Sequence, residues 1–420
     1  MLSQLETSPR NGHEVTVPPR GRGVVRQGAA FWLVATALAV TMLGTTLPTP
    51  LYVLYEQQFG LATLMGTVIF AVYATGVLAA LLVLGRASDE FGRKRMLLVG
   101  LAFAALSAVS FLLAHGVALL IVGRVLSGLA AGIFTGTATA ALVDLAGAGH
   151  GRRATMVATG SNMGGLGLGA LLAGILAQFA PLPLRLTYWV DLGLILLAIV
   201  AVSVVPDAVA VPAHPRLRLR PPSVPPSVRP AFLRVAIAGF AGFSVLGLFT
   251  AVTPSFLLDL LHEPSHALSG GLVFVLFAAS ALGQIALARP LGRHAMAAGC
   301  GALITGMGLL AVGLAATSLP FVVAAAIVAG LGQGLCMRAG LEAITTQAPA
   351  QHRAGIASAF FIVMYIAIAL PVVGEGLAAT RLGPRTTGIA FTVAVATIAG
   401  VALATLIRGR SQPAGLPASA

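Results

Sequence analysis

The chain has 420 residues, of which 58% are hydrophobic and 9% are charged, and its formal net charge is +13. Soluble domains carry about 25% charged residues, so this composition excludes an ordinary soluble protein. The basic residues lie in alternate connecting segments instead of one stripe, which argues against a nucleic-acid partner. We therefore expect a protein whose main solvent is the lipid bilayer.

Apolar runs of about 20 residues, each long enough to cross a bilayer, recur along the chain. A polar, Arg-bearing tail (1–28) precedes the first run, which many similar runs follow, so we expect an uncleaved span and no secretory signal. The fold class we expect is an all-α membrane protein with twelve transmembrane helices in two pseudo-symmetric six-helix bundles. The predicted helices are 29–51, 63–84, 96–115, 117–143, 155–178, 185–205, 233–258, 268–288, 295–316, 319–345, 355–379 and 386–407.

Basic side chains sort unevenly between the two sides of this bundle. Only Arg185, Arg381 and Arg385 fall on one side, and the single Lys94 and the other arginines that lie outside the apolar runs fall on the other. The positive-inside rule then predicts that both termini are cytoplasmic. The preference for Arg over Lys suggests a GC-rich bacterial genome, so we expect a multi-pass protein of the bacterial plasma membrane.

A Pro-rich, Arg-bearing segment at 206–232 divides the chain into bundles at 29–205 and 233–407, with a cytoplasmic tail at 408–420. The two halves show a distant repeat. The stretch from Arg152 can be laid over that from Arg353, and the matching segments TPLYVLY and TPSFLLD end the first and seventh helices. Such repeats are typical of transporters that rock one bundle against the other.

The strongest local motif is GRASDEFGRKR, between the second and third helices. It resembles the cytoplasmic signature of the major facilitator superfamily, with Gly85, Asp89, Gly92 and Arg93 filling the pattern, and helix number, linker and half-repeat extend the resemblance to nearly the whole chain. The glycines permit a tight turn. The resemblance implies that Asp89 and Arg93 help to hold a cytoplasmic gate closed. The alternative is a solvated loop that only sets topology.

Further cytoplasmic charges lie at the ends of the fourth and tenth helices. We expect Asp144 to pair with Arg152 and Arg153, and Glu342 with Arg353, as additional parts of the gate. The equally acceptable alternative is a set of ordinary interfacial charges, each worth under about 1 kcal/mol.

Arg124 lies inside the fourth apolar run in an R-x-x-S-G setting, which resembles a second signature of the proton-linked branches of the family. A buried arginine should face the bundle interior and meet a carboxylate or a backbone carbonyl. The resemblance implies that Arg124 has a role in proton coupling or substrate contact. The alternative is a purely structural ion pair. The Gly-rich fifth helix resembles the exporter motif of the drug/proton antiporter branch, although Ala170 replaces its usual proline.

Proton carriers must be ionisable groups in or near the bilayer. We rank Glu375 in the eleventh helix first, Asp191 in the sixth second, and also consider Glu56 just beyond the first helix. The first helix contains no acidic residue, unlike that of several proton-coupled drug exporters. Each candidate could instead lie at the membrane edge and extend its carboxylate to water.

The substrate cavity should lie near the midplane, where the two bundles meet. Ordinary packing is the alternative for each aromatic residue among its candidates. The candidate cavity residues are Tyr73, Thr135, Asn162, Phe249, Gln284, Gln333, Arg338 and Tyr365.

No metal or cofactor is expected. His262, Glu263 and His266 have a suggestive spacing, but the intervening proline argues against a helix that would bring them together. Cys300 and Cys336 fall inside apolar runs, where ordinary packing explains them. The chain has no Walker loop, dinucleotide fingerprint or nucleophile elbow, so neither an ATP-driven pump nor an enzyme is indicated.

We therefore expect a monomeric secondary transporter that works by alternating access and couples proton movement to efflux of a drug-like or amphipathic small molecule. The apolar span interiors favour a lipophilic substrate over a sugar phosphate. The nearest alternative is an uptake symporter or uniporter for a small nutrient. A different class, a ligand sensor derived from a transporter, would bind without transport.

Overall fold

The computed structural model describes residues 27–84, 87–147, 149–207, 224–261, 263–349 and 352–410. Within these ranges the chain forms helices and turns and no β-strand. The long helices are α1 (Gln27–Thr46), α3 (Thr63–Leu84), α5 (Arg93–Leu112), α6 (Val117–Ala146), α7 (Gly151–Phe179), α8 (Pro183–Ser203), α9 (Arg229–Ala251), α11 (His266–Leu282), α13 (Ala295–Ala315), α14 (Leu319–Gln347), α15 (Arg353–Leu382) and α16 (Pro384–Arg410). The short ones are η1 (Thr49–Leu51), α2 (Tyr52–Phe59), α4 (Ala87–Phe91), η2 (Pro226–Val228), α10 (Thr253–Asp259), the π-helical η3 (Gly283–Leu287), α12 (Ala288–Leu291) and η4 (Gly292–His294).

Eleven helical stretches of the described chain are long and apolar enough to cross a membrane. The longest, at 266–315, has 50 residues and contains both α11 and α13. Gly292, with a φ of +47° that favours glycine, lies at the turn between them. Each predicted span overlaps one long helix of the described chain, but α11 and α13 fall within one apolar stretch, so twelve separate crossings stay a prediction.

Most predicted helix bounds agree with the structure to within a few residues, and α3 has the predicted bounds. The first helix ends earlier than expected, at Thr46, because Pro48 and Pro50 lack the backbone N–H groups that a continuous helix would need. The chain then continues as η1 and α2. At the linker, α9 begins at Arg229 instead of 233, so the last residues assigned to the linker belong to the second bundle.

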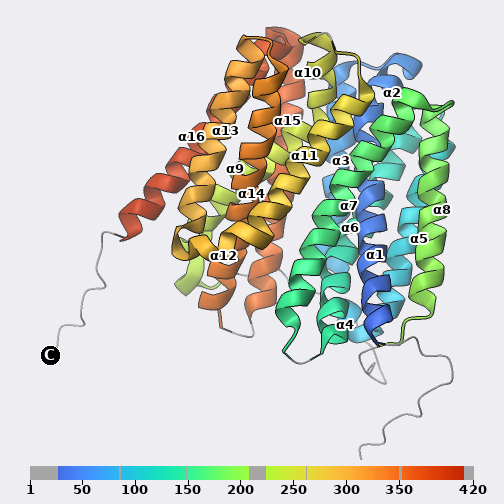
Figure 1. The fold of residues 1–420 in the computed structure, drawn as a ribbon, viewed down its shortest axis with the longest axis vertical. Helices are drawn as coiled ribbons and strands as arrows, with labels where there is room; N and C mark the ends of the chain where they lie inside the picture. The colour runs from blue at the N-terminus through green and yellow to red at the C-terminus, as the bar shows by residue number, and fades with distance from the viewer. Residues whose placement is uncertain are drawn as a thin grey trace, which may run out of the picture.

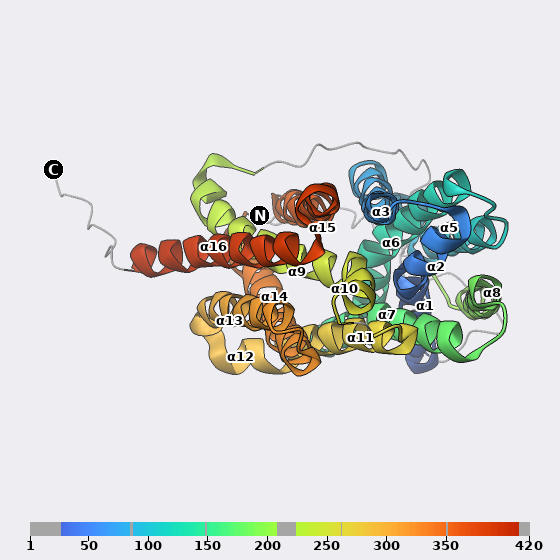
Figure 2. The same ribbon diagram turned by 90° about the horizontal axis from the view of Figure 1, so that it is seen from above.

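The long helices form two bundles, one from α1 to α8 and one from α9 to α16, which lie side by side (Figures 1 and 2). Both α2 and α10 lie at one end of the molecule, and α4 and α12 lie toward the other (Figure 1). We call these the α2/α10 end and the α4/α12 end. The matching Thr-Pro segments of the two halves thus form equivalent short helices at the same end.

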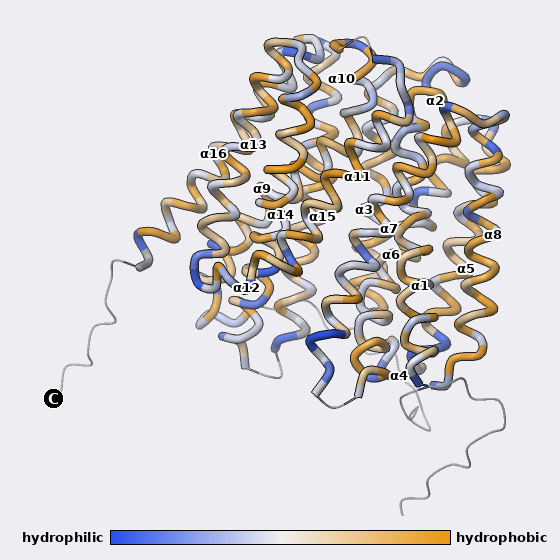
Figure 3. The backbone as a smooth tube through the Cα atoms, in the orientation of Figure 1, coloured by the Kyte–Doolittle hydropathy of each residue, from blue (hydrophilic) through white to orange (hydrophobic). Residues whose placement is uncertain are grey.

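The outer surface of the bundles is apolar. Hydrophobic residues run along the long helices, and hydrophilic residues gather toward the ends (Figure 3). Large side chains such as Leu197, Val200 and Leu370 are largely exposed. Because water would disfavour so many exposed apolar side chains, this surface is one that lipid covers. The expected all-α membrane fold is confirmed.

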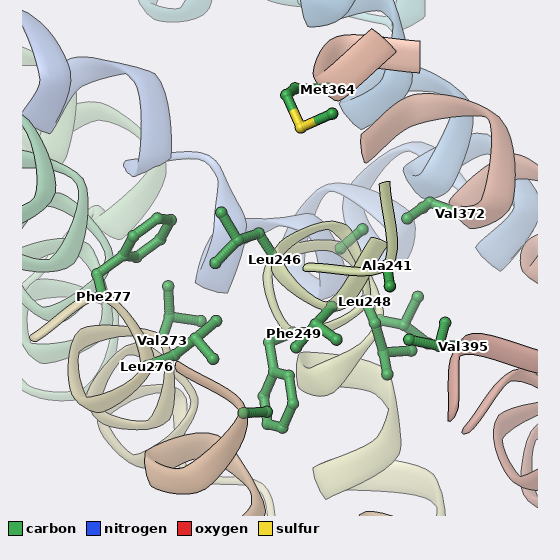
Figure 4. Packing of buried hydrophobic residues seen from close by; sticks show 14 of the residues in the cluster. Ala241, Leu246, Leu248, Phe249, Val273, Leu276, Phe277, Met364, Val372 and Val395 are labelled. Carbon is green, nitrogen blue, oxygen red and sulfur yellow. The ribbon is translucent and has the colours of Figure 1, made fainter. Parts of the chain in front are cut away.

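The second bundle packs around α9, whose buried side chains meet those of α11, α15 and α16 (Figure 4). Phe249 of α9 is fully buried in this cluster, together with Val273, Met364 and Val395. Glycine allows the close approach of α9 to α15, because a methyl carbon on Gly247 would lie 2.6 Å from the carbonyl oxygen of Ile368. This packing joins α9 closely to α15 within the second half.

Two antiparallel helix pairs join the halves: α7 with α11, and α3 with α15 (Figure 2). The α7/α11 contact is tightest near the α2/α10 end, where a methyl carbon on Gly270 would lie 2.9 Å from the carbonyl carbon of Ala170 and closer still to its oxygen. A methyl carbon on Gly167 would lie 3.1 Å from the Phe274 ring, and one on Gly160 would lie 3.8 Å from the Ile285 side chain. The contact therefore loosens toward the α4/α12 end.

Candidate functional site

The signature motif between α3 and α5 forms a tight turn at the α4/α12 end (Figure 1). Gly92 has φ +92° and ψ 147°, a conformation that side chains disfavour, and it permits Arg93 to begin α5 directly after α4. The Arg93 guanidinium contacts Asp89 Oδ1 at 2.5 Å, Ser88 Oγ at 2.6 Å and Asp144 Oδ2 at 3.2 Å. Gly85 lies outside the described residues.

The next residue extends this network. Lys94 donates through Nζ to the carbonyl oxygen of Ser203, and its backbone N–H donates to Asp207 Oδ1 at 3.4 Å. The turn therefore ties α4 and α5 to the ends of α6 and α8. All of these contacts lie within the first half.

The charge pairs expected for Asp144 and Glu342 have other partners in the structure. Asp144 contacts Arg93, which opens α5, instead of Arg152 or Arg153. Glu342 contacts Arg338, one turn earlier in α14, at 3.7 Å, instead of Arg353.

The remaining gate candidates lie apart from the signature turn. Arg353 donates to the carbonyl oxygen of Ala348 at 3.2 Å. Arg153 lines a cavity of about 540 Å³ between the start of α7 and Ile285 of η3. The structure thus brings together Asp89, Gly92, Arg93 and Asp144, and places Arg153 and Arg353 elsewhere.

Arg124 of α6 is buried, with 2% of its surface exposed. It donates to the carbonyl oxygens of Thr45 at 2.7 Å and Phe70 at 3.3 Å, and its guanidinium lies 4.7 Å from the ring centre of Tyr73. The sequence led us to expect either a carboxylate or a backbone carbonyl as the partner of Arg124. The structure supplies backbone carbonyls, with an aromatic ring face beside them. The side chain joins α6 to α1 and α3.

Two of the three candidate proton carriers are buried inside the bundles. Asp191 of α8 and Glu375 of α15 are each 3% exposed, so neither carboxylate reaches water at a membrane edge. In the described chain, Asp191 Oδ1 and both Glu375 carboxylate oxygens have no hydrogen-bond partner. Asp191 packs against α1, because a methyl carbon on Gly44 would lie 3.1 Å from both its oxygens.

Glu56 occupies a different position. It lies on α2 and lines a small cavity of about 230 Å³ with Leu61 and, from the other half, Ser255 and Asp259 of α10. This cavity bridges the two halves at the α2/α10 end. Partial burial raises the pKa of Asp259 above its ordinary value.

A polar cluster lies in the second half beside α7. Ser280 of α11 donates to Gln333 Oε1 at 2.5 Å and accepts from Gln284 Nε2 at 3.2 Å, and its oxygen lies 3.6 Å from the Met163 sulfur. Gln284 lies in the π-helical segment, a distortion that is frequent at functional sites. Sequence reasoning found the two glutamines and missed Ser280, because one small hydroxyl in an apolar run is an ordinary feature of membrane helices.

The other cavity candidates divide into two groups. The rings of Tyr73 and Tyr365 lie 6.2 Å apart across the α3/α15 contact, so they belong to both halves. Thr135 donates to its own helix, and Asn162 is half-buried on α7. Phe249 and Arg338 differ from the expectation, because Phe249 is buried in the core of the second half and Arg338 is partly exposed beside Glu342.

The described residues contain no cluster of three or more metal-binding side chains. His262 lies outside the described residues. Cys300 and Cys336 are buried free thiols on the adjacent helices α13 and α14.

Residues 34–370 match the sequence model of the Major Facilitator Superfamily, and the chain belongs to this family. It is thus a multi-pass membrane transporter. The family resemblance of the signature turn is thereby confirmed.

Curated relatives cover part of the chain. It is 32% identical over 188 residues to the triacylglyceride transporter of Mycolicibacterium hassiacum, which is 44% of this chain and 32% of that protein. It is 32% identical over 143 residues to the triacylglyceride transporter of Mycolicibacterium smegmatis, which is 32% of this chain and 24% of that protein. The chain thus spans a third or less of the length of these relatives.

Solved structures are similar over nearly the full length. A bacterial homologue of the human lysosomal transporter Spinster, in an inward-facing and unoccupied conformation, matches with a TM-score of 0.71 and 15% identity, covering 92% of this chain and 99% of the other. The human organic anion transporter MFSD10 matches with a TM-score of 0.64 and 15% identity, covering 91% and 100%. These similarities show the fold.

Proposed function

We propose that the protein is a proton-coupled exporter of an amphipathic small molecule that works by alternating access. The observation that carries this proposal is the pair of buried carboxylates, Asp191 in the first half and Glu375 in the second. In the described chain neither forms an ion pair, and both lie among apolar helices. A charged group is costly in such surroundings, so a carboxyl there is suited to exchange a proton when the bundles rearrange and water reaches it.

Arg124 supports a coupling role for the first half. Its charge is held by two backbone carbonyls and lies beside the rings of Phe70 and Tyr73, with no carboxylate among these contacts. The contacts of this guanidinium are carbonyl oxygens and aromatic rings, so none of them is an opposite charge. It can therefore shift the electrostatic potential at a substrate or at a protonated carboxyl nearby.

The two contacts between the halves supply the moving parts. The α7/α11 pair is tight near the α2/α10 end and looser toward the α4/α12 end, where the cavity beside Arg153 opens. A rocking motion about these helices would close one end as the other opens. The polar cluster around Ser280 and the Tyr73–Tyr365 pair lie along them and are suited to contact a substrate.

The proposed substrate bears acyl chains or a similar apolar body. The curated relatives are named triacylglyceride transporters, and the interior of this chain offers few fixed polar groups. A transport path lined by apolar side chains with a few amide and hydroxyl groups would suit an acylglycerol better than a sugar or a phosphate ester. We propose an acylglycerol-like amphipath on these grounds.

We further propose that the protein acts as a monomer in a bacterial plasma membrane with the α4/α12 end in the cytoplasm. Arg93, Lys94 and Arg153 lie at that end, and Arg185, Arg381 and Arg385 lie at the other. This distribution follows the positive-inside rule.

The proposal is tested by transport into proteoliposomes with an imposed pH gradient, using a fluorescent diacylglycerol, a lipophilic cation and a labelled sugar. The expected result is gradient-dependent movement of the first or second compound that a protonophore abolishes, with no movement of the sugar. Movement of the sugar would favour uptake of a nutrient, and transport that ignores the gradient would contradict proton coupling. Protein-free liposomes are the control.

A further inference from the structure

A second cavity lies inside the first half, away from both contacts between the halves. It has a volume of about 780 Å³ and opens at the α2/α10 end. Its walls come from α2, from the end of α5 with the turn that follows it, and from the start of α8. The proposed transport path does not use this cavity.

The polar side of this cavity carries positive charge. Arg185 and His115 line it together with the amides of Gln57 and Gln58, and no carboxylate is among its lining residues. All four side chains are exposed. An anion would therefore find a guanidinium and several neutral donors, and would meet no repelling charge.

The apolar side of the cavity is built from stacked aromatic rings. Phe111 stacks on Tyr188 with ring centres 4.8 Å apart, and Phe59 stacks on Tyr55 at 5.9 Å. Both phenylalanines line the cavity. The volume falls in the range of about 300–1000 Å³ typical of small-molecule sites. A cavity lined by both a cationic side chain and aromatic rings fits an amphipathic anion.

The mouth of the cavity lies next to a surface that lipid covers. Leu182 lines the cavity and is largely exposed, and Trp189, one helical turn after Arg185, is 61% exposed. Exposed tryptophan is typical of the membrane interface, where headgroups lie. Leu182 has a φ of +52°, an unfavourable conformation for leucine, and such strain is often found at functional sites.

The position of Arg185 is not explained by topology. It is one of only three arginines on the side of the membrane that the positive-inside rule disfavours for basic residues. The other two, Arg381 and Arg385, are also exposed at the α2/α10 end, but they do not line this cavity.

We propose that this cavity binds the headgroup of an anionic phospholipid from the leaflet at the α2/α10 end. Arg185 contacts the phosphate, His115 and the two glutamines contact the rest of the headgroup, and the aromatic wall holds the upper part of the acyl chains. The site is separate from the transport path. It makes the protein sensitive to the lipid composition of that leaflet.

The two tryptophans of the chain provide a direct test. In a Trp32→Phe background, Trp189 is the only fluorophore of its kind and lies one turn from Arg185. The protein is reconstituted in bilayers of phosphatidylcholine and phosphatidylglycerol in which one or the other lipid is brominated, and quenching of Trp189 reports which lipid lies beside it. The expected preference for phosphatidylglycerol is about fivefold, the factor given by about 1 kcal/mol per basic side chain at an anionic membrane surface.

The variants decide the outcome. Arg185→Gln should reduce the preference to about one, and Arg185→Lys should retain most of it because the charge remains. Arg381→Gln removes the same charge from the same end and should behave like the wild type. Equal preference in Arg185→Gln and the wild type would overturn the proposal.

A free anion is the other possible occupant. Dodecyl phosphate, added as monomers to protein in phosphatidylcholine bilayers, tests it through its effect on the same tryptophan. If dodecyl phosphate changes the emission in an Arg185-dependent way and phosphatidylglycerol shows no preference, the site takes a soluble amphipath and the lipid proposal is wrong. Preference for phosphatidylglycerol, lost in Arg185→Gln, supports it.

Discussion

Gly270 of α11 faces the backbone of α7 where the halves approach most closely. A methyl carbon there would lie 2.9 Å from the carbonyl carbon of Ala170, against the 3.4 Å at which ordinary van der Waals contact begins. Gly270→Ala must therefore separate the two helices by at least 0.5 Å, the difference between those distances. Backbone atoms cannot turn aside as a flexible side chain can, so the strain falls on the contact itself.

The strain should act on one conformation only. When the halves part at the α2/α10 end, Gly270 and α7 separate and the added methyl has room. Overpacking costs about 1–3 kcal/mol, so the substitution should shift the balance away from the closed α2/α10 end by about 5- to 150-fold. Transport should slow, because the cycle must pass through the closed form.

Spin labels at the α2/α10 end can measure this shift. Phe179→Cys at the end of α7 and Glu263→Cys in the loop before α11 place one exposed label on each half. Cys300 and Cys336 are buried and should react slowly. Double electron–electron resonance should show one short distance between the two labels in the labelled parent and a longer distance between them with Gly270→Ala.

The neighbouring glycine is a matched control. A methyl carbon on Gly271 would meet nothing within 4 Å, so Gly271→Ala adds the same group to the same helix without the clash. It should keep the short distance and the transport rate of the parent. Equal distance distributions in Gly270→Ala and Gly271→Ala would show that the added methyl at Gly270 does not strain the closed form.

Three further predictions concern the charged groups. Arg93→Gln removes contacts to partly exposed carboxylates, so it should lower the free energy of unfolding by about 1 kcal/mol or less. The same variant should slow transport. Equal transport rates in the variant and the wild type would contradict a gating role for Arg93. Arg124→Lys replaces a guanidinium that donates to two carbonyl oxygens with a single ammonium, so the transport rate should fall at least about tenfold. Gel filtration should show that the fold is intact. A retained transport rate would show that transport does not depend on the two carbonyl contacts. Burial raises the pKa of Asp259, so the charged form of this carboxyl is disfavoured where α10 packs near α2. Acid should therefore stabilise the closed α2/α10 end, and this contribution should be lost as the pH rises through that pKa. The spin-label distances across pH should lose this dependence in Asp259→Asn, and an unchanged pH profile would contradict it.

Much of the fold could be predicted from the sequence because lipid imposes simple rules. A run of apolar residues bounded by charge or Gly becomes a span, and α3 has the bounds its sequence predicts. The turn at Gly92 follows from a glycine motif that is local in the chain. The breaks after α1 and α9 follow from prolines at matching positions in the two halves.

The site was harder to predict because its contacts are distant in sequence. Asp144 meets Arg93, 51 residues away, and no local pattern favours that partner over Arg153. The sequence identified Glu375 as intramembrane but could not tell whether its side chain faces protein or the membrane edge, because that depends on how α15 is rotated. Phe249 illustrates the opposite error, since an aromatic residue near the midplane packs in one half instead of facing the other.

We propose that Asp191 and Glu375 exchange the protons that drive transport. Substrate-triggered proton release tests this role in proteoliposomes containing the wild type, Glu375→Gln, Asp191→Asn or the exposed-carboxylate control Glu263→Gln. We expect release in the wild type and the control, loss in Glu375→Gln and reduction in Asp191→Asn. Substrate movement without proton release in the wild type, or undiminished release when both buried carboxylates are replaced, would contradict this role.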